Sequence, residues 1–168
     1  MRALTILSTS AILLSSIFSY NLHAAEHEIK MLNSGKDGSM VFEPGTIKVE
    51  VGDTVKFIST DAGHNSESKF APEGATAWKG EIGKDITVTI DKEGIYIYSC
   101  SPHTVMAMVG VIQAGKASNE EGAKKKAKEL ANTFIMNKDR LDKYLETLKS
   151  TSNDDKKKTD TEKKKEDK

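Results

Sequence analysis

The stretch Ser99–Gly110 reads SCSPHTVMAMVG and holds three side chains that bind soft or borderline metal ions. Cys100, the only cysteine of the 168-residue chain, lies three residues before His103 and eight before Met108. A second histidine, His64, lies in the loop DAGHNSE, directly after a segment that alternates as a strand does. Two imidazoles, a thiolate and a thioether form the ligand set of a blue copper site.

This mixture of ligands has a chemical reason. Copper(II) favours nitrogen and oxygen ligands, whereas copper(I) favours soft sulfur. One compromise arrangement suits both states, so little has to move when an electron is gained or lost. Three other interpretations stay open at this point. They are a structural zinc site, although zinc avoids thioether, a Cys and His nucleophilic pair, although no orienting group or oxyanion motif is evident, and a cysteine and methionine that are merely buried in the core.

The N-terminal segment predicts export. Residues 1–24 carry one charge, at Arg2, followed by the apolar run AILLSSIF and the small residue Ala24. This order is typical of a secretory signal peptide, so we expect cleavage before Ala25 or one residue later. An uncleaved membrane anchor is the alternative, but the run is far shorter than the roughly 20 residues that span a bilayer. An unpaired cysteine in an oxidising compartment needs protection by burial, by metal or by a catalytic role.

Charge divides the chain into an acidic front and a basic rear. Residues 25–115 hold 8 lysines and 13 acidic residues, and residues 116–168 hold 16 basic and 12 acidic residues. Neither part has the basic, aromatic-interleaved pattern of a nucleic-acid-binding surface. Residues 151–168 offer almost nothing apolar to bury, so we expect a disordered, solvated tail. A weak electrostatic tether to a membrane or partner is the alternative for this tail.

Residues 25–115 carry the signals of a β-sandwich. Apolar residues recur with a period of two, and turn sequences such as EPG, VGD, PEG and KEG separate these segments. Several short strands at this spacing are typical of a sandwich or a barrel. The expected strands are 46–51, 54–60, 86–90 and 94–100, with a returning strand at 109–112.

The pattern of apolar residues in 116–150 predicts two helices. The sequence SNEE at Ser118–Glu121 fits a capping box. Apolar residues then recur at intervals of three and four, first over Ala123, Ala127, Leu130, Ala131 and Phe134, and again from about 138 to 149 over Leu141, Tyr144, Leu145 and Leu148. We expect both helices to pack on the sandwich. A helix pair that binds a partner is the alternative.

The residues from about 25 to 148 resemble the pseudoazurin family of blue copper proteins, which belong to the cupredoxin class. The resemblance lies in CSPHTVMAMVGVI, the upstream GHN and the opening MLNSGKDGSMVFEPGTIKVEVGDTVKF. It implies a mainly β fold, a cupredoxin Greek-key β-sandwich with two C-terminal α-helices. It also implies one copper ion per monomer, with His64, Cys100, His103 and an axial Met108 as its ligands and Met106 as a neighbouring apolar residue.

The resemblance further implies a periplasmic electron carrier, not an enzyme, which is monomeric and exchanges electrons with nitrite reductase or a c-type cytochrome. No membrane span is expected after signal cleavage. A copper storage or delivery protein is the alternative function, but such sites tend to be methionine-rich or exposed.

Three further residues are expected to support the ligands by this resemblance. Asn65 would direct its backbone N–H at the Cys100 sulfur and join the two ligand loops through its side chain. Pro102 lacks an N–H that could reach the sulfur, which favours Cu(I), and Met40 would pack close to His103. One departure concerns the lysines that often surround the copper end of pseudoazurins, because this chain places Ser34, Ala62 and Ser99 there.

Overall fold

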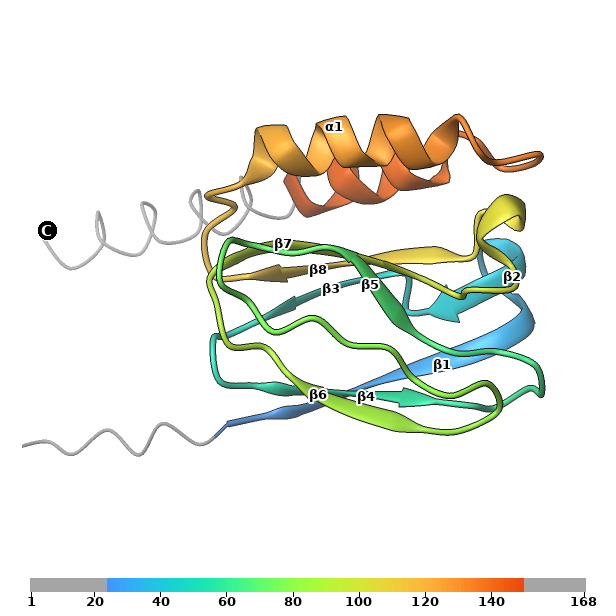
Figure 1. Cartoon of the computed structure of the whole chain (residues 1–168), viewed down its shortest axis with the longest axis horizontal. Helices are drawn as coiled ribbons and strands as arrows, with labels where there is room; N and C mark the ends of the chain where they lie inside the picture. Colours follow the sequence, from blue (N-terminus) through green and yellow to red (C-terminus); the bar gives the residue numbers. More distant parts are fainter. Residues whose placement is uncertain (1–23, 150–168) are drawn as a thin grey trace, which may run out of the picture.

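Two four-stranded sheets lie face to face in the computed structural model, which describes residues 24–149 (Figure 1). The first sheet has the strand order β2-β1-β4-β6 and the second the order β3-β8-β7-β5. The strands are β1 (Glu26–Gly35), β2 (Gly38–Glu43), β3 (Thr46–Val49), β4 (Thr54–Ile58), β5 (Glu67–Phe70), β6 (Ile86–Thr89), β7 (Gly94–Ser99) and β8 (Val109–Ala114).

The connectivity agrees with the predicted cupredoxin Greek-key sandwich. β1 pairs with β4 in parallel, and β3 pairs with β8 in parallel, while the other neighbours are antiparallel. The four strands expected between residues 46 and 100 are present, each ending one or two residues earlier than expected. The fold class, mainly β with two C-terminal helices, is therefore confirmed.

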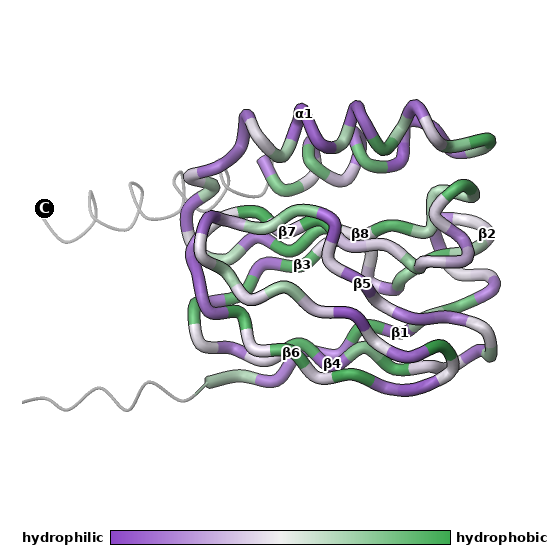
Figure 2. The backbone as a smooth tube through the Cα atoms, viewed as in Figure 1, coloured by the Kyte–Doolittle hydropathy of each residue, from purple (hydrophilic) through white to green (hydrophobic). Residues whose placement is uncertain are grey.

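The central strands β7 and β8 are buried on both faces. On β7, Tyr96 and Tyr98 belong to the core between the sheets, whereas Ile95 and Ile97 belong to a second core. This second core lies between the sheet and the helices, and Figure 2 shows hydrophilic residues on the outward turns of α1. Because successive side chains of a strand point to opposite faces, β7 and β8 require both cores.

Two helical segments cover the outer face of the second sheet (Figure 1). Helix α1 spans Glu120–Ala131, and the C-terminal helix spans 140–149 in the described residues. Phe134 lies beyond the end of α1 but is still buried in the helix-side core. No helix among residues 24–149 combines the length and the hydropathy needed to cross a bilayer. The expected signal peptide (1–24, apart from its last residue) and the expected tail (151–168) lie outside the described residues.

The predicted capping box at Ser118 is wrong. Asn119 is the N-cap of α1, and it makes no side-chain capping bond. Its side chain instead accepts a hydrogen bond from the backbone N–H of Ile95 (2.7 Å) and donates one to the Ile95 carbonyl (3.0 Å). Asn119 therefore supplies hydrogen-bond partners for the N–H and the carbonyl of Ile95, at the part of β7 that β5 does not reach. Ser118 is exposed, and its hydroxyl donates to the Glu93 carbonyl at 3.4 Å.

This difference between neighbours can be tested by substitution. Replacing Asn119 by Ala leaves two backbone groups of Ile95 without partners, and we expect the free energy of unfolding to fall by about 1–3 kcal/mol. Ser118→Ala is the matched control and should cost less than about 0.5 kcal/mol. Urea unfolding measures both. If Ser118→Ala lowered the free energy of unfolding more than Asn119→Ala, a capping role of Ser118 would be supported instead.

Candidate metal centre

Three metal-binding side chains converge at one end of the sandwich. The Nδ1 atoms of His64 and His103 lie 3.1 Å apart. The sulfur of Cys100 lies 3.4 Å from Nδ1 of His103 and 3.7 Å from Nδ1 of His64. The structure thus brings together three of the four residues that the sequence singled out, from two loops that are 36 residues apart.

These distances fit a single metal ion. The circle through three points with these separations has a radius of about 2.0 Å, the product of the sides divided by four times the area of the triangle. Histidine nitrogen and cysteine sulfur bind zinc at about 2.0–2.3 Å, and a first-row metal such as copper takes the same ligand types. The spacing and the chemistry of the donors therefore agree with a copper ion bound by all three.

The position of Cys100 follows from strand β7. Cys100 comes directly after the strand, and its side chain continues the alternation of Tyr96 and Tyr98 into the core between the sheets. Its backbone N–H donates to the Met108 carbonyl (3.0 Å), and the N–H of Met108 donates to the His103 carbonyl (3.2 Å). The loop between β7 and β8 is thereby closed around the sulfur.

His64 reaches the same point from the loop after β4, and Asn33 orients it. The Nε2 atom of the His64 ring lies 3.0 Å from the side-chain oxygen of Asn33. That oxygen accepts a hydrogen bond, so the proton of a neutral ring belongs on Nε2 and the Nδ1 lone pair faces Cys100. Burial lowers the pKa of His64, and His103 lowers it further against the opposing effect of Asp61. Both effects keep the ring neutral.

The role of Asn33 was not predicted from the sequence, because its contact with His64 joins residues that are 31 positions apart. Asn33 lies on β1, and its backbone N–H donates to the Asp61 carboxylate (2.6 Å). The parallel pairing of β1 with β4 brings it beside the His64 loop. No motif in the sequence marked it.

The thiol of Cys100 lies under two opposing influences. Burial raises its pKa, whereas the backbone N–H groups of Asn65 and His103 favour the thiolate and act against that rise. Its side chain is fully buried. A bound metal displaces the proton of such a thiol, because only the thiolate is a good ligand.

Asn65 joins the two ligand loops through its side chain. Its carboxamide oxygen accepts from the backbone N–H of Ser101 (2.8 Å), and its Nδ2 donates to the Ser101 hydroxyl (3.0 Å) and the Gly80 carbonyl (2.9 Å). Ser101 in turn donates to Glu67 (2.6 Å), and this bond is the main cause of the lowered pKa of Glu67. Ser101 and Glu67 were not identified from the sequence.

The remaining predicted residues lie around the trio. Met108 is fully buried and belongs to the same core cluster as Cys100, whereas Met106 is partly exposed. Met40 is half-buried and packs against that cluster from strand β2. Pro102 is exposed.

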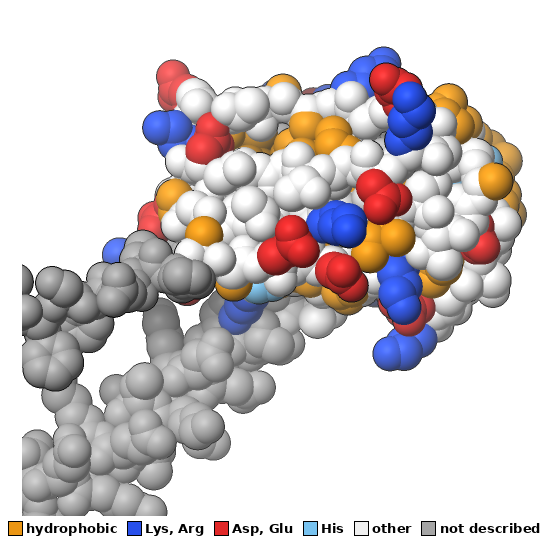
Figure 3. Space-filling view, turned by 90° about the horizontal axis from the view of Figure 1, so that it is seen from below, with side chains coloured by type: hydrophobic (Ala, Val, Ile, Leu, Met, Phe, Trp, Pro, Cys, Tyr) orange, Lys and Arg blue, Asp and Glu red, His pale blue; other side chains and the backbone are white. Residues whose placement is uncertain are grey.

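His103 lies at the surface of this end, beside apolar residues. It is half-buried, whereas His64 and Cys100 are fully buried. The backbone N–H of Ile135 donates to the Val105 carbonyl (2.8 Å), which places the loop after α1 against the short helix η1 (Thr104–Met106). We call the exposed side chains Pro102, Val105, Ile135 and Met136 the apolar rim. Figure 3 shows hydrophobic side chains gathered at this end.

Of the three positions expected to replace surface lysines, two are exposed and one is not. Ser34 and Ala62 are exposed. Ser99 is fully buried, and its hydroxyl lies 3.0 Å from that of Thr104. Ser99 is therefore part of the loop's internal support, and its placement on the docking surface is wrong.

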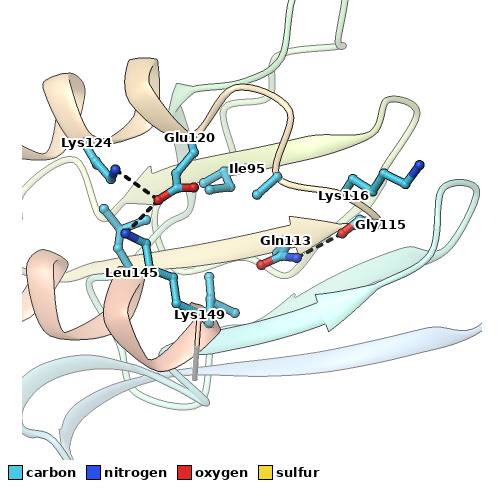
Figure 4. A pocket seen from close by; sticks show the side chains of 10 residues that line it. Ile95, Gln113, Gly115, Lys116, Glu120, Lys124, Leu145 and Lys149 are labelled. Carbon is cyan, nitrogen blue, oxygen red and sulfur yellow. Dashed lines mark hydrogen bonds and ion pairs between the residues drawn. The ribbon is translucent and has the colours of Figure 1, made fainter. Parts of the chain in front are cut away.

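A recess of about 600 Å³ lies elsewhere, between the two helices and the far ends of β7 and β8 (Figure 4). Glu120 in its wall pairs with Lys124 (3.0 Å) and Lys149 (2.7 Å). None of its lining residues belongs to the metal-binding trio.

Comparison with known proteins agrees with this geometry. Residues 29–115 match the family described as copper binding proteins, plastocyanin/azurin family. The chain is 43% identical over 107 residues to the pseudoazurin of Paracoccus pantotrophus, covering 62% of this chain and 74% of the relative. It is also 43% identical over 128 residues to the pseudoazurin of Methylorubrum extorquens, covering 73% and 84%. A solved pseudoazurin from Sinorhizobium superimposes with a TM-score of 0.66 at 39% identity, over 75% of this chain and 98% of that one. The chain therefore belongs to the plastocyanin/azurin family of copper-binding proteins and, within it, to the pseudoazurins.

Proposed function

We propose that the protein is a periplasmic carrier of single electrons and that His64, Cys100, His103 and Met108 hold its copper ion. The convergence of two imidazole nitrogens and one thiolate sulfur on a single point carries the proposal. The burial of Met108 beside Cys100 favours it over Met106 as the fourth, axial ligand. Copper, when bound, supplies the one-electron Cu(II)/Cu(I) couple.

The protein's own residues position the ligands, exclude water and provide the route for the electron. Asn33 fixes the His64 ring, while Asn65 holds the Cys100 loop against the His64 loop. The buried positions of His64 and Cys100 exclude water and hold the ligands nearly still. His103 alone among the trio reaches the surface, so its ring edge is the point at which electrons enter and leave. No bond of a substrate is made or broken, so this function is not enzymatic.

The apolar rim around His103 supports docking of redox proteins at this end. Apolar contact allows brief, close approach, while charge governs the rate of encounter. Residues 25–115 carry five more acidic than basic residues, and Ser34 and Ala62 offer no positive charge. We infer a partner with a weakly charged or basic face, such as a c-type cytochrome, in preference to an acidic nitrite reductase.

A copper storage or delivery protein is the second candidate. Delivery requires release of the metal, and release is easiest from exposed ligands. The buried positions of His64 and Cys100 favour retention instead.

The optical spectrum of the protein loaded with Cu(II) tests the ligand assignment. A thiolate bound to Cu(II) gives an intense visible band by charge transfer, and we expect this band in the wild-type protein and none in Cys100→Ser. Met108→Leu should retain the band and shift the reduction potential, because the axial ligand tunes it. Met106→Leu is the matched control and should change neither. A colourless protein with full copper occupancy would contradict the proposal.

The hydrogen bond from His64 to Asn33 can be tested by its effect on affinity. Asn33→Ala removes the acceptor that fixes the imidazole, and we expect the affinity for Cu(II) to fall about 10–100-fold, with the visible band retained. Asn33→Asp keeps an acceptor oxygen and should stay close to wild type. Competition with a chelator of known affinity measures both. Equal affinities in the Ala variant and the wild type would remove Asn33 from the site.

The docking hypothesis predicts a weak dependence on salt. We expect the second-order rate of electron transfer to a weakly charged c-type cytochrome to change little with ionic strength, and the rate to an acidic nitrite reductase not to fall as salt is added. The variant Ser34→Lys/Ala62→Lys places two positive charges at exposed positions and should show a steeper fall in rate with salt for the acidic reductase. Stopped-flow kinetics measures these rates for the wild-type protein and for the variant. A steep fall for the wild-type protein would contradict the hypothesis.

A further inference from the structure

A buried arginine connects the C-terminal helix to the metal-binding end. Arg140 is only 4% exposed, at the first turn of that helix. Its Nη1 donates to the carbonyls of Met40 (2.9 Å) and Ala107 (2.6 Å). Its Nη2 donates to the carbonyls of Asp37 (3.0 Å) and Ser39 (3.1 Å). One guanidinium thus holds four carbonyls from two separate segments, the turn between β1 and β2 with the start of β2, and the loop between β7 and β8.

The partners of Arg140 are all backbone groups. Among residues 24–149, its guanidinium forms no ion pair within 4.0 Å. A buried charge is costly unless its hydrogen bonds are satisfied. The planar fork of arginine satisfies several carbonyls at fixed angles, which a lysine ammonium does not. The buried charge of Arg140 therefore serves to fix these two segments relative to each other.

Two of the four carbonyls belong to residues with unusual backbone angles. Met40 has φ of 51° and Ala107 has φ of 58°, in the left-handed region that residues with a side chain seldom adopt. Ala107 caps η1, and its N–H donates to the Thr104 carbonyl (2.9 Å). Such conformations persist only where the surroundings hold them, and Nη1 of Arg140 binds both residues.

The Ala107 carbonyl is also one end of the peptide group that leads into Met108. The other end is the Met108 N–H, which donates to the His103 carbonyl (3.2 Å). Because a peptide group is planar, Arg140 and His103 together fix its orientation. The Met108 carbonyl in turn accepts a hydrogen bond from the N–H of Cys100 (3.0 Å), so both the N–H and the carbonyl of Met108 have partners.

We propose that Arg140 is a positioning residue for the copper centre. It holds the Ala107–Met108 peptide in place and so sets how the Met108 thioether lies relative to Cys100 and the two histidines. The inference rests on the proposed role of Met108 as a ligand. Through this contact, the C-terminal helix tunes the site from outside the sandwich.

The test uses two variants on the same helix. Arg140→Lys keeps the positive charge and loses the planar fork. Tyr144→Phe is the matched control, because the Tyr144 hydroxyl donates to the Asp37 carboxylate (2.7 Å) on the turn between β1 and β2, whereas the Ala107 carbonyl accepts from Arg140. Both changes weaken the attachment of the helix, so both should lower the unfolding midpoint. Only the first releases the Ala107–Met108 peptide.

The copper-loaded proteins give the first readout. In Arg140→Lys we expect a changed intensity ratio of the thiolate-to-copper bands. We also expect at least a threefold change in the equilibrium constant with a one-electron reference couple, about 30 mV at about 59 mV per tenfold. Tyr144→Phe should leave both unchanged. In a Met108→Leu background, Arg140→Lys should cause no further shift, because it acts through Met108.

The metal-free protein gives a second readout that does not depend on copper. The NMR signal of the Met108 methyl group should move in Arg140→Lys and stay in place in Tyr144→Phe. Arg140→Gln, which keeps donors for two of the carbonyls at most, serves if the lysine variant does not fold. A wild-type spectrum and potential in a folded Arg140 variant would overturn the inference and leave the proposed function standing. A wild-type protein without a blue band would overturn both.

Discussion

The sulfur of Cys100 must be buried and still be available as a thiolate, and much of the structure follows from this conflict. Burial raises the pKa of the thiol, which favours the proton over the charge. Backbone N–H groups of Asn65 and His103 oppose that effect, and the two imidazoles beside the sulfur complete a pocket in which a metal replaces the proton. The same burial protects an unpaired cysteine from oxidation.

Burial of this sulfur depends on layers that are distant from it. Cys100 continues the inward side of β7, but the outward side of β7 is equally apolar and has to be covered. The two helices cover it, so they are needed for the strand that carries the cysteine. Asn119 and Arg140 bind the helical layer to the sandwich through backbone groups, one at each end of the second sheet. The helical layer is thus part of the support of the metal centre.

The sequence predicted the parts of the fold that short-range patterns determine. Alternation in TIKVEV and GIYIYSC identified β3 and β7, and the spacing of Cys100, His103 and Met108 identified the loop between β7 and β8. Strands β1, β2 and β5 were not among the expected strands, and the segment ESKF of β5 is only half-buried throughout and has little apolar contrast. The motif SNEE satisfied a local rule, yet Asn119 forms its bonds with a strand 24 residues away. Asn33 and Arg140 act across 31 and 33 residues or more, where no spacing rule applies.

These long-range contacts also determine when the metal centre becomes complete. His64 is oriented from β1, and the loop that carries Met108 is held from the last helix of the described chain. A partly folded sandwich would contain the ligands, but it would lack the acceptor that fixes the His64 ring and the guanidinium that fixes the Ala107 carbonyl. A metal that requires all of the donors in one arrangement then binds the folded state far more tightly than any partly folded one. Binding of copper and docking of the C-terminal helix would therefore stabilise each other, because both depend on the loop between β7 and β8.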